Sequence, residues 1–133
     1  MPAPAIGPHI VAVETALTAA GVVVGQGGAP SPIPASGQYA AVYFDPGQSL
    51  PESLADRRTL FALGFQVTAV GPTRDACLWV TQKVRDALHA PLSVPGRAAW
   101  RAEELGGPPV QRDDDVSPPV FYLPVQYRLM STS

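Results

Sequence analysis

The sequence has 133 residues and a mass of 13.9 kDa, which suits one folded domain. Hydrophobic residues make up 46% of it, enough to form a core, and nine basic against eleven acidic residues leave a net charge of −2. This balance excludes the strongly basic surface of a protein that holds DNA by neutralising its phosphates. A single cysteine, Cys77, excludes an internal disulfide framework and a cysteine-rich zinc site.

No apolar run approaches the length needed to span a bilayer, and no positive charge precedes the first apolar stretch as it does in a secretory signal. We therefore expect a soluble protein that is made in the cytoplasm and has no membrane partner. The two histidines, His9 and His89, are too few and too far apart in sequence to indicate a metal cluster.

The first third of the chain predicts one helix and two strands. Apolar residues recur at spacings of three and four over residues 9–20, the pattern of an amphipathic helix, with Pro8 at its start and Gly21 at its end. Residues 22–24 are suited to a short strand, and residues 39–45 are rich in aromatic and β-branched side chains that favour a second. Between them, Gly, Pro and Ser predict a mobile loop near residues 25–38.

The middle of the chain predicts a strand followed by a helix. A polar loop near residues 46–59 precedes residues 60–70, in which apolar side chains alternate and predict a strand with one buried face. Residues 74–89 carry an apolar stripe behind Thr73, a good N-cap, so a second helix is expected there.

The last third predicts two more strands. One is expected around residues 97–103 and the other over residues 120–130, where apolar side chains alternate again. Pro124 lacks a backbone donor, which favours an edge position or a bulge for the last strand. A loop near residues 106–119 carries three consecutive aspartates, Asp113, Asp114 and Asp115.

This order of elements predicts an α+β fold in one domain over residues 1–133. We expect a small mixed or antiparallel sheet that two helices cover on one face. The predicted core consists of eight apolar side chains: Phe61, Phe65, Val67, Val80, Val84, Phe121, Leu123 and Val125.

Residues that suggest chemistry each have a plainer interpretation. Three adjacent aspartates cannot readily converge on one cation, so residues 113–115 are interpreted as a solvated acidic loop. Cys77 lies on the apolar stripe of the second helix, which indicates a buried structural cysteine rather than a nucleophile. The chain lacks a Gly-x-Ser-x-Gly turn and a complete phosphate-binding loop. We therefore predict no enzymatic activity, no cofactor and no metal.

Leu78 and Trp79 interrupt the polar side of the second helix. At 100° per residue, both project away from the apolar stripe centred between Val80 and Val84. Two large apolar side chains on an otherwise wet face indicate cover by a loop or by a neighbouring subunit. An isolated exposed aromatic residue is also common, so both interpretations stay open.

Residues 39–88 resemble a known family. The stretch Ala41-Val42-Tyr43-Phe44-Asp45-Pro46-Gly47, the strand Gln66-Val67-Thr68-Ala69-Val70-Gly71 and the helix opening Thr73-Arg74 are similar to tail terminator (tail completion) proteins of long-tailed bacteriophages, especially of phages infecting actinobacteria. The closing stretch, residues 124–129, fits the last strand of that family. The resemblance rests on a pattern of strand, turn and helix, and the proline-rich and acidic loops have no counterpart in it.

The resemblance implies a non-enzymatic ring, generally a hexamer, at the head–tail junction of a virion. Such a ring caps the tail tube and joins it to the head-completion or connector protein, while genome DNA passes through its channel without specific binding. Leu78 and Trp79 would then contact neighbouring subunits. The charged residues of the loop at 46–59 would contact a neighbour or the tail tube: Glu52, Asp56, Arg57 and Arg58. Asp113, Asp114 and Asp115 would face the channel and repel DNA.

Three other classes of function compete with this hypothesis. The chain is also suited to another head–tail connector part, such as a head-closure protein or a minor tail protein. A small host binding module or a toxin–antitoxin partner would instead form a discrete monomer or dimer. An enzyme is the third class, and it lacks a nucleophile, a base and an orienting group in the sequence.

Overall fold

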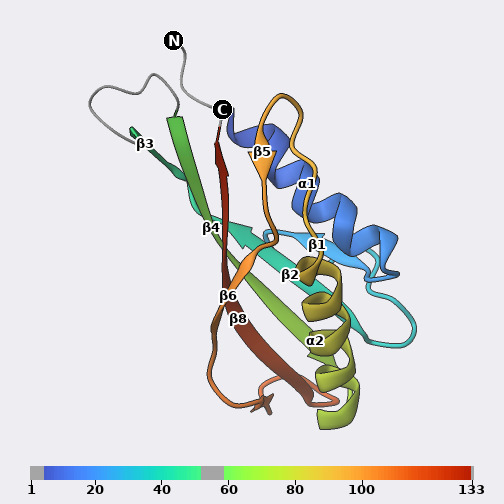
Figure 1. Ribbon diagram of the computed structural model, residues 1–133. Helices are drawn as coiled ribbons and strands as arrows, with labels where there is room; N and C mark the ends of the chain where they lie inside the picture. Colours follow the sequence, from blue (N-terminus) through green and yellow to red (C-terminus); the bar gives the residue numbers. More distant parts are fainter. Residues whose placement is uncertain (1–4, 52–58, 133) are drawn as a thin grey trace.

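The computed structural model describes residues 5–51 and 59–132 of the chain. Two helices lie against one face of an open, mixed sheet, which confirms the predicted α+β fold (Figure 1). Strands β1, β2, β4 and β8 follow one another across the sheet. Strand β3 extends the β2 side of β4, and three short strands, β5, β6 and β7, line the far side of β8.

The elements have the following bounds. The helices are α1 (Ile6–Ala19) and α2 (Arg74–His89). The strands are β1 (Val24–Gln26), β2 (Tyr39–Phe44), β3 (Gln48–Pro51), β4 (Thr59–Gly71), β5 (Ala98–Ala99), β6 (Glu103–Gly106), β7 (Gln111–Asp113) and β8 (Val120–Thr132).

The centre of the sheet is the antiparallel pair of β4 and β8. Their register runs unbroken from Leu60 opposite Thr132 to Gly71 opposite Phe121. Alternate side chains of both strands turn toward the helices and are buried, as the alternation predicts. Of the eight predicted core side chains, seven are buried and Phe121 is half-buried.

Helix α2 lies across this pair and matches its predicted bounds. The Thr73 hydroxyl accepts a hydrogen bond from the Ala76 amide at 3.1 Å, and so caps the first turn. Thr81 is also buried, on the face of α2 that packs against the sheet. Its hydroxyl donates a hydrogen bond to the Cys77 carbonyl at 3.0 Å. This bond within the helix satisfies the hydroxyl, so the polar side chain can be buried.

The first helix and strand are displaced from their predicted positions. Helix α1 begins three residues earlier than expected, at Ile6, with Pro8 inside its first turn, where a missing donor costs nothing. The Val22 amide donates to the Leu17 carbonyl at 3.1 Å, so this residue belongs to the cap that follows the helix rather than to a strand. Strand β1 therefore begins at Val24 and includes Gly25 and Gln26 of the predicted loop.

The predicted loop at 46–59 contains a strand, β3, which pairs antiparallel with the start of β4. The turn before it depends on Asp45, whose carboxylate accepts hydrogen bonds from the amides of Gly47 at 2.8 Å and Gly64 at 3.1 Å. Gly47 has a φ of 74°, and a Cβ there would collide with the Phe61 ring. This position therefore requires glycine.

The segment before β8 also differs from its prediction. The single strand expected around residues 97–103 is replaced by two short ones, β5 and β6, and the loop at 106–119 contains a third, β7. Pro124 was expected at an edge or a bulge. Strand β8 as a whole has neighbours on both sides, but Pro124 lies in the gap between β6 and β7, beside the register shift of β6. Its carbonyl faces Gly107, and the side of the residue that lacks an N–H donor is therefore locally an edge.

A buried polar network joins α1 to the end of the sheet. The His9 Nδ1–H donates to the Ala5 carbonyl at 2.7 Å, and Nε2 accepts from the Ser131 hydroxyl at 2.7 Å. Arg97 donates to the same hydroxyl oxygen at 2.8 Å, and the His9 ring lies 4.5 Å from the Phe61 ring. Burial, with the positive charge of Arg97, lowers the pKa of His9 below its ordinary value despite the bond to Ala5.

This network predicts a loss of stability in mild acid. Because the pKa of His9 is lower in the folded protein, the unfolded chain binds more protons as the pH falls below about 6.5, and the free energy of unfolding decreases. Chemical denaturation between about pH 7 and about pH 5.5 measures this slope. We expect a smaller slope in His9→Gln, which lacks the buried imidazole. Equal slopes in the wild-type protein and the variant would contradict the assignment.

The buried face of β4 is tested by Phe65→Ala. Phe65 packs between the rings of Phe44 and Tyr127, each with its centroid 5.5 Å away, so truncation should cost about 3–5 kcal/mol in chemical denaturation. Gln126→Ala, on the exposed face of β8, is the control and should cost less than about 1 kcal/mol. A loss below about 1 kcal/mol for Phe65→Ala would mean that the strand faces are reversed.

Candidate subunit interfaces

Trp79 lies on the outer side of α2, as its position in the sequence predicts. Half of its side chain is exposed, at 50%, and its neighbour Leu78 is 43% exposed. The covered part of the ring faces a small hollow of about 160 Å³ that is also lined by Val23, Ser36 and Tyr39. A loop therefore covers one part of Trp79 and leaves the other part open.

Lys83 holds the Trp79 ring in place. Its ammonium lies 4.5 Å from the ring centroid and also donates to the Ala20 carbonyl at 3.3 Å. The carbonyl fixes the position of the cation, and the cation favours one orientation of the ring. A large aromatic side chain that is already oriented loses little conformational entropy on contact with another protein.

The acidic residues occupy a turn at one end of the sheet. Asp113 ends β7 and is half-buried, so the predicted acidic loop is partly strand. Its Oδ1 accepts a hydrogen bond from the Asp115 amide at 3.0 Å, and Arg112 pairs with Asp114 at 2.5 Å. Asp114 and Asp115 are exposed, as expected of solvated charges. Their position relative to a channel stays a prediction.

Four predicted interface residues lie outside the described residues: Glu52, Asp56, Arg57 and Arg58. The structure therefore does not test their roles.

Cys77 is fully buried, which confirms the prediction of a structural cysteine. Its thiol donates to the Ala69 carbonyl of β4 at 3.4 Å. Burial raises the pKa of the thiol to about 11, so the reactive thiolate is scarce at neutral pH. Over residues 5–51 and 59–132, no group of three or more potential ligands is arranged to hold a metal ion. No helix in the same ranges is long and apolar enough to cross a membrane.

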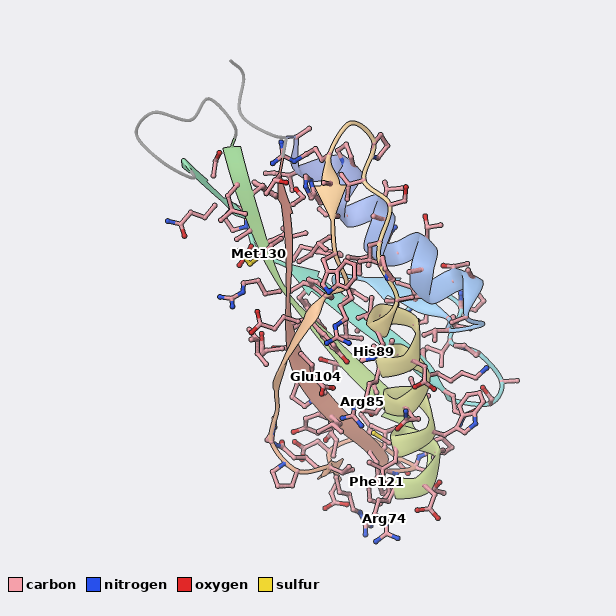
Figure 2. The ribbon with its side chains drawn as sticks, viewed as in Figure 1. Arg74, Arg85, His89, Glu104, Phe121 and Met130 are labelled. Carbon is pink, nitrogen blue, oxygen red and sulfur yellow. The ribbon has the colours of Figure 1, made fainter. Side chains whose placement is uncertain are left out.

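A groove that the sequence does not reveal lies between the second half of α2 and the edge of the sheet. Its volume is about 620 Å³, and Figure 2 shows Arg85, His89 and Glu104 gathered at it. Three side-chain pairs cross or border the groove. They are Arg85–Glu104 at 2.8 Å, Arg128–Glu103 at 2.6 Å and Arg101–His89 at 2.9 Å.

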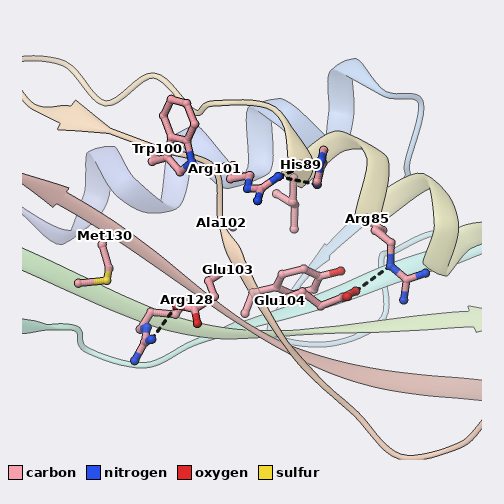
Figure 3. Close-up of a pocket in the computed structure, with 11 residues that line it drawn as sticks. Arg85, His89, Trp100, Arg101, Ala102, Glu103, Glu104, Arg128 and Met130 are labelled. Carbon is pink, nitrogen blue, oxygen red and sulfur yellow. Dashed lines mark hydrogen bonds and ion pairs between the residues drawn. The ribbon is translucent and has the colours of Figure 1, made fainter.

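The three arginines differ in their partners (Figure 3). Arg85 and Arg128 each bind a glutamate, whereas Arg101 contacts the imidazole of His89 and, within the described chain, no carboxylate. The groove therefore carries an excess of positive charge at Arg101. The neighbouring Trp100 is 67% exposed.

Tyr127 lines the groove from β8. Its side chain is buried, with only 2% exposure, and its hydroxyl lies close to the Glu104 carboxylate. Burial, together with the negative charge of Glu104 and a hydrogen bond to it, raises the pKa of Tyr127 above its ordinary value. The phenol therefore stays protonated at neutral pH and is a potential donor.

Sequence patterns did not identify this groove because the segment before β8 was expected to be one strand. In a regular strand, Trp100 and Arg101 would point to opposite faces. Residues 100–102 lie between β5 and β6 and adopt neither strand nor helix. The sequence feature that could have indicated this groove is Trp100 and Arg101 followed closely by Glu103 and Glu104. How these four side chains lie in space depends on how β5 and β6 pair with β8.

The fold is shared with a solved virion protein. The chain aligns with a chain of a solved structure named "Virion of native gene transfer agent (GTA) particle" at a TM-score of 0.63 and 17% sequence identity. The alignment covers 92% of this chain and 93% of that one, so the two share a fold over nearly their full lengths. No family model and no curated protein matches the sequence.

Proposed function

We propose that this protein is a structural component of a phage-like virion, where it forms a ring that caps the tail tube and joins it to the head connector. The observation that carries the proposal is the fold shared, end to end, with a chain of a gene transfer agent virion. The resemblance of residues 39–88 to tail terminator proteins is what favours a ring at the end of the tail tube.

The surface of the described chain supports self-association. Apolar side chains are exposed on different sides of the molecule, with Leu78 and Trp79 on α2 and with Trp100 and Met130 lining the groove. A closed ring requires head-to-tail contacts, in which two different surfaces of each subunit meet. Separate apolar patches are consistent with this requirement.

The charge of the chain is consistent with a channel for DNA. A net charge of −2 gives the ring as a whole no excess of cations to neutralise phosphates, so DNA can slide through it. The proposal requires no catalytic chemistry and no cofactor. The partners are other copies of the chain, the tail tube protein and the head-completion protein.

The mass of the native assembly tests the proposal. Analytical ultracentrifugation and negative-stain imaging of the purified protein, alone and mixed with tail tubes, should show a ring with a central hole. A protein that remains a monomer or dimer in both cases, without affinity for tubes, would favour the host binding module instead.

A different connector part is the second candidate, because the matching structure is a whole virion and its name specifies no single component. A head-closure protein or a minor tail protein would also form virion contacts. Antibody labelling of intact particles distinguishes them, since a tail terminator should be labelled at the tail end nearest the head.

Trp79→Ala should weaken ring formation while leaving the subunit folded. The substitution removes a half-exposed anchor that Lys83 holds in place, so its main effect falls on association. Sedimentation velocity measures the distribution of assemblies, and circular dichroism checks the fold. Thr15→Ala, on the exposed side of α1, should leave the ring unchanged. An intact ring in Trp79→Ala would exclude this residue from the interface.

Arg57 and Arg58 are predicted to pair with carboxylates of the tail tube or of an adjacent subunit. Replacing both with serine should reduce the joining of rings to tails and should increase its sensitivity to salt. The double substitution is preferable to deleting residues 49–57, because the deletion would also remove most of β3. A joining assay at low and moderate salt provides the measurement. Normal joining by the double variant would mean that these two arginines form no such pair.

A further inference from the structure

We infer that the groove beside Arg101 is a subunit interface that receives the acidic turn of residues 113–116 from a second copy of the chain. The inference deepens the proposed function and rests on it, because it assigns the two surfaces that meet in the ring. It is supported by charge complementarity, by matching apolar groups and by the distance between the two surfaces within one subunit.

The charges of the two surfaces complement each other. In the groove, the glutamates neutralise Arg85 and Arg128 but leave Arg101 facing a histidine ring. In the turn, Arg112 neutralises Asp114, while Asp113 and Asp115 have no cationic partner within the described chain. Each surface therefore carries a net charge that the other can neutralise.

The apolar neighbours of these charges also match. Next to Asp115 lies Val116, 43% of which is exposed. Next to Arg101 lies the exposed Trp100, and Met130 lines the same groove. The Asp115 carboxylate can thus pair with the Arg101 guanidinium while Val116 packs against the Trp100 ring. An arginine and a tryptophan together are typical of the residues that dominate protein interfaces.

One subunit cannot make this contact with itself. The turn follows β7, which pairs with β8 at residues 120–122, whereas the groove borders β8 at residues 127–130. At about 3.3 Å per strand residue, these positions lie roughly 20 Å apart. Figure 2 shows Phe121 and Met130 near opposite ends of β8. The contact must therefore join two copies, and because the surfaces differ it is head-to-tail.

Charge reversal tests the pairing. Arg101→Asp and Asp115→Arg should each shift the assembly to smaller species in sedimentation velocity, and the double variant should restore the ring. Glu14→Arg on α1 is the matched control for Asp115→Arg, because it makes the same charge change away from both surfaces, and it should leave the ring intact. A ring that persists in Arg101→Asp, or a double variant that fails to recover, overturns the inference while leaving the proposed ring in place.

Disulfide trapping tests the geometry without requiring ring closure. In the variant Val116→Cys with Met130→Cys, the two cysteines of one subunit are too far apart to bond, and Cys77 is buried. Mild oxidation should therefore give a ladder of dimers, trimers and higher species on non-reducing gels, whereas each single-cysteine variant should not. Dimers only, or equal dimer formation by a single-cysteine variant, would overturn the head-to-tail contact. If oxidation traps no oligomer and the unmodified protein also forms no ring, both the inference and the proposed function are overturned.

Discussion

The structure depends on the antiparallel pair of β4 and β8. Each strand is 13 residues long, and their register is unbroken over almost the whole length. One face of the pair is apolar and packs against α2. The other face carries polar side chains such as Gln126, whose Nε2 donates a hydrogen bond to Oε1 of Gln66 at 2.7 Å. Since one residue of slippage would exchange these faces, the apolar alternation fixes the register.

The other strands are short because they follow the ends of this pair. Strand β3 covers the first residues of β4, and β5, β6 and β7 divide the edge of β8 between them. The edge of β8 is thereby blunted, since interrupted strands offer a second chain no continuous ladder. The same interruption places Trp100 and Arg101 outside regular structure, where both side chains can border one groove.

Elements that depend on local patterns were predicted well from the sequence. The bounds of α2 follow from Thr73 and the apolar stripe, and the buried face of β4 follows from alternation. Strands β3 and β7 were missed because their stability comes from pairing with distant residues, and their sequences are polar or contain proline. Trp79 could be recognised from helical periodicity, whereas the groove requires residues from α2, the segment at 100–104 and β8 to come together.

Two aromatic patches, one around Trp79 and one around Trp100, constrain how copies of the chain can assemble. Trp79 borders a hollow formed with residues near β1 and β2, whereas Trp100 borders the groove at the β8 edge. The patches therefore belong to opposite edges of the sheet. A two-fold dimer would bury one such patch against its own copy and leave the other exposed on both subunits. A closed ring gives every subunit two different neighbours, so the neighbour whose acidic turn enters the groove can cover Trp100 and the other neighbour can cover Trp79.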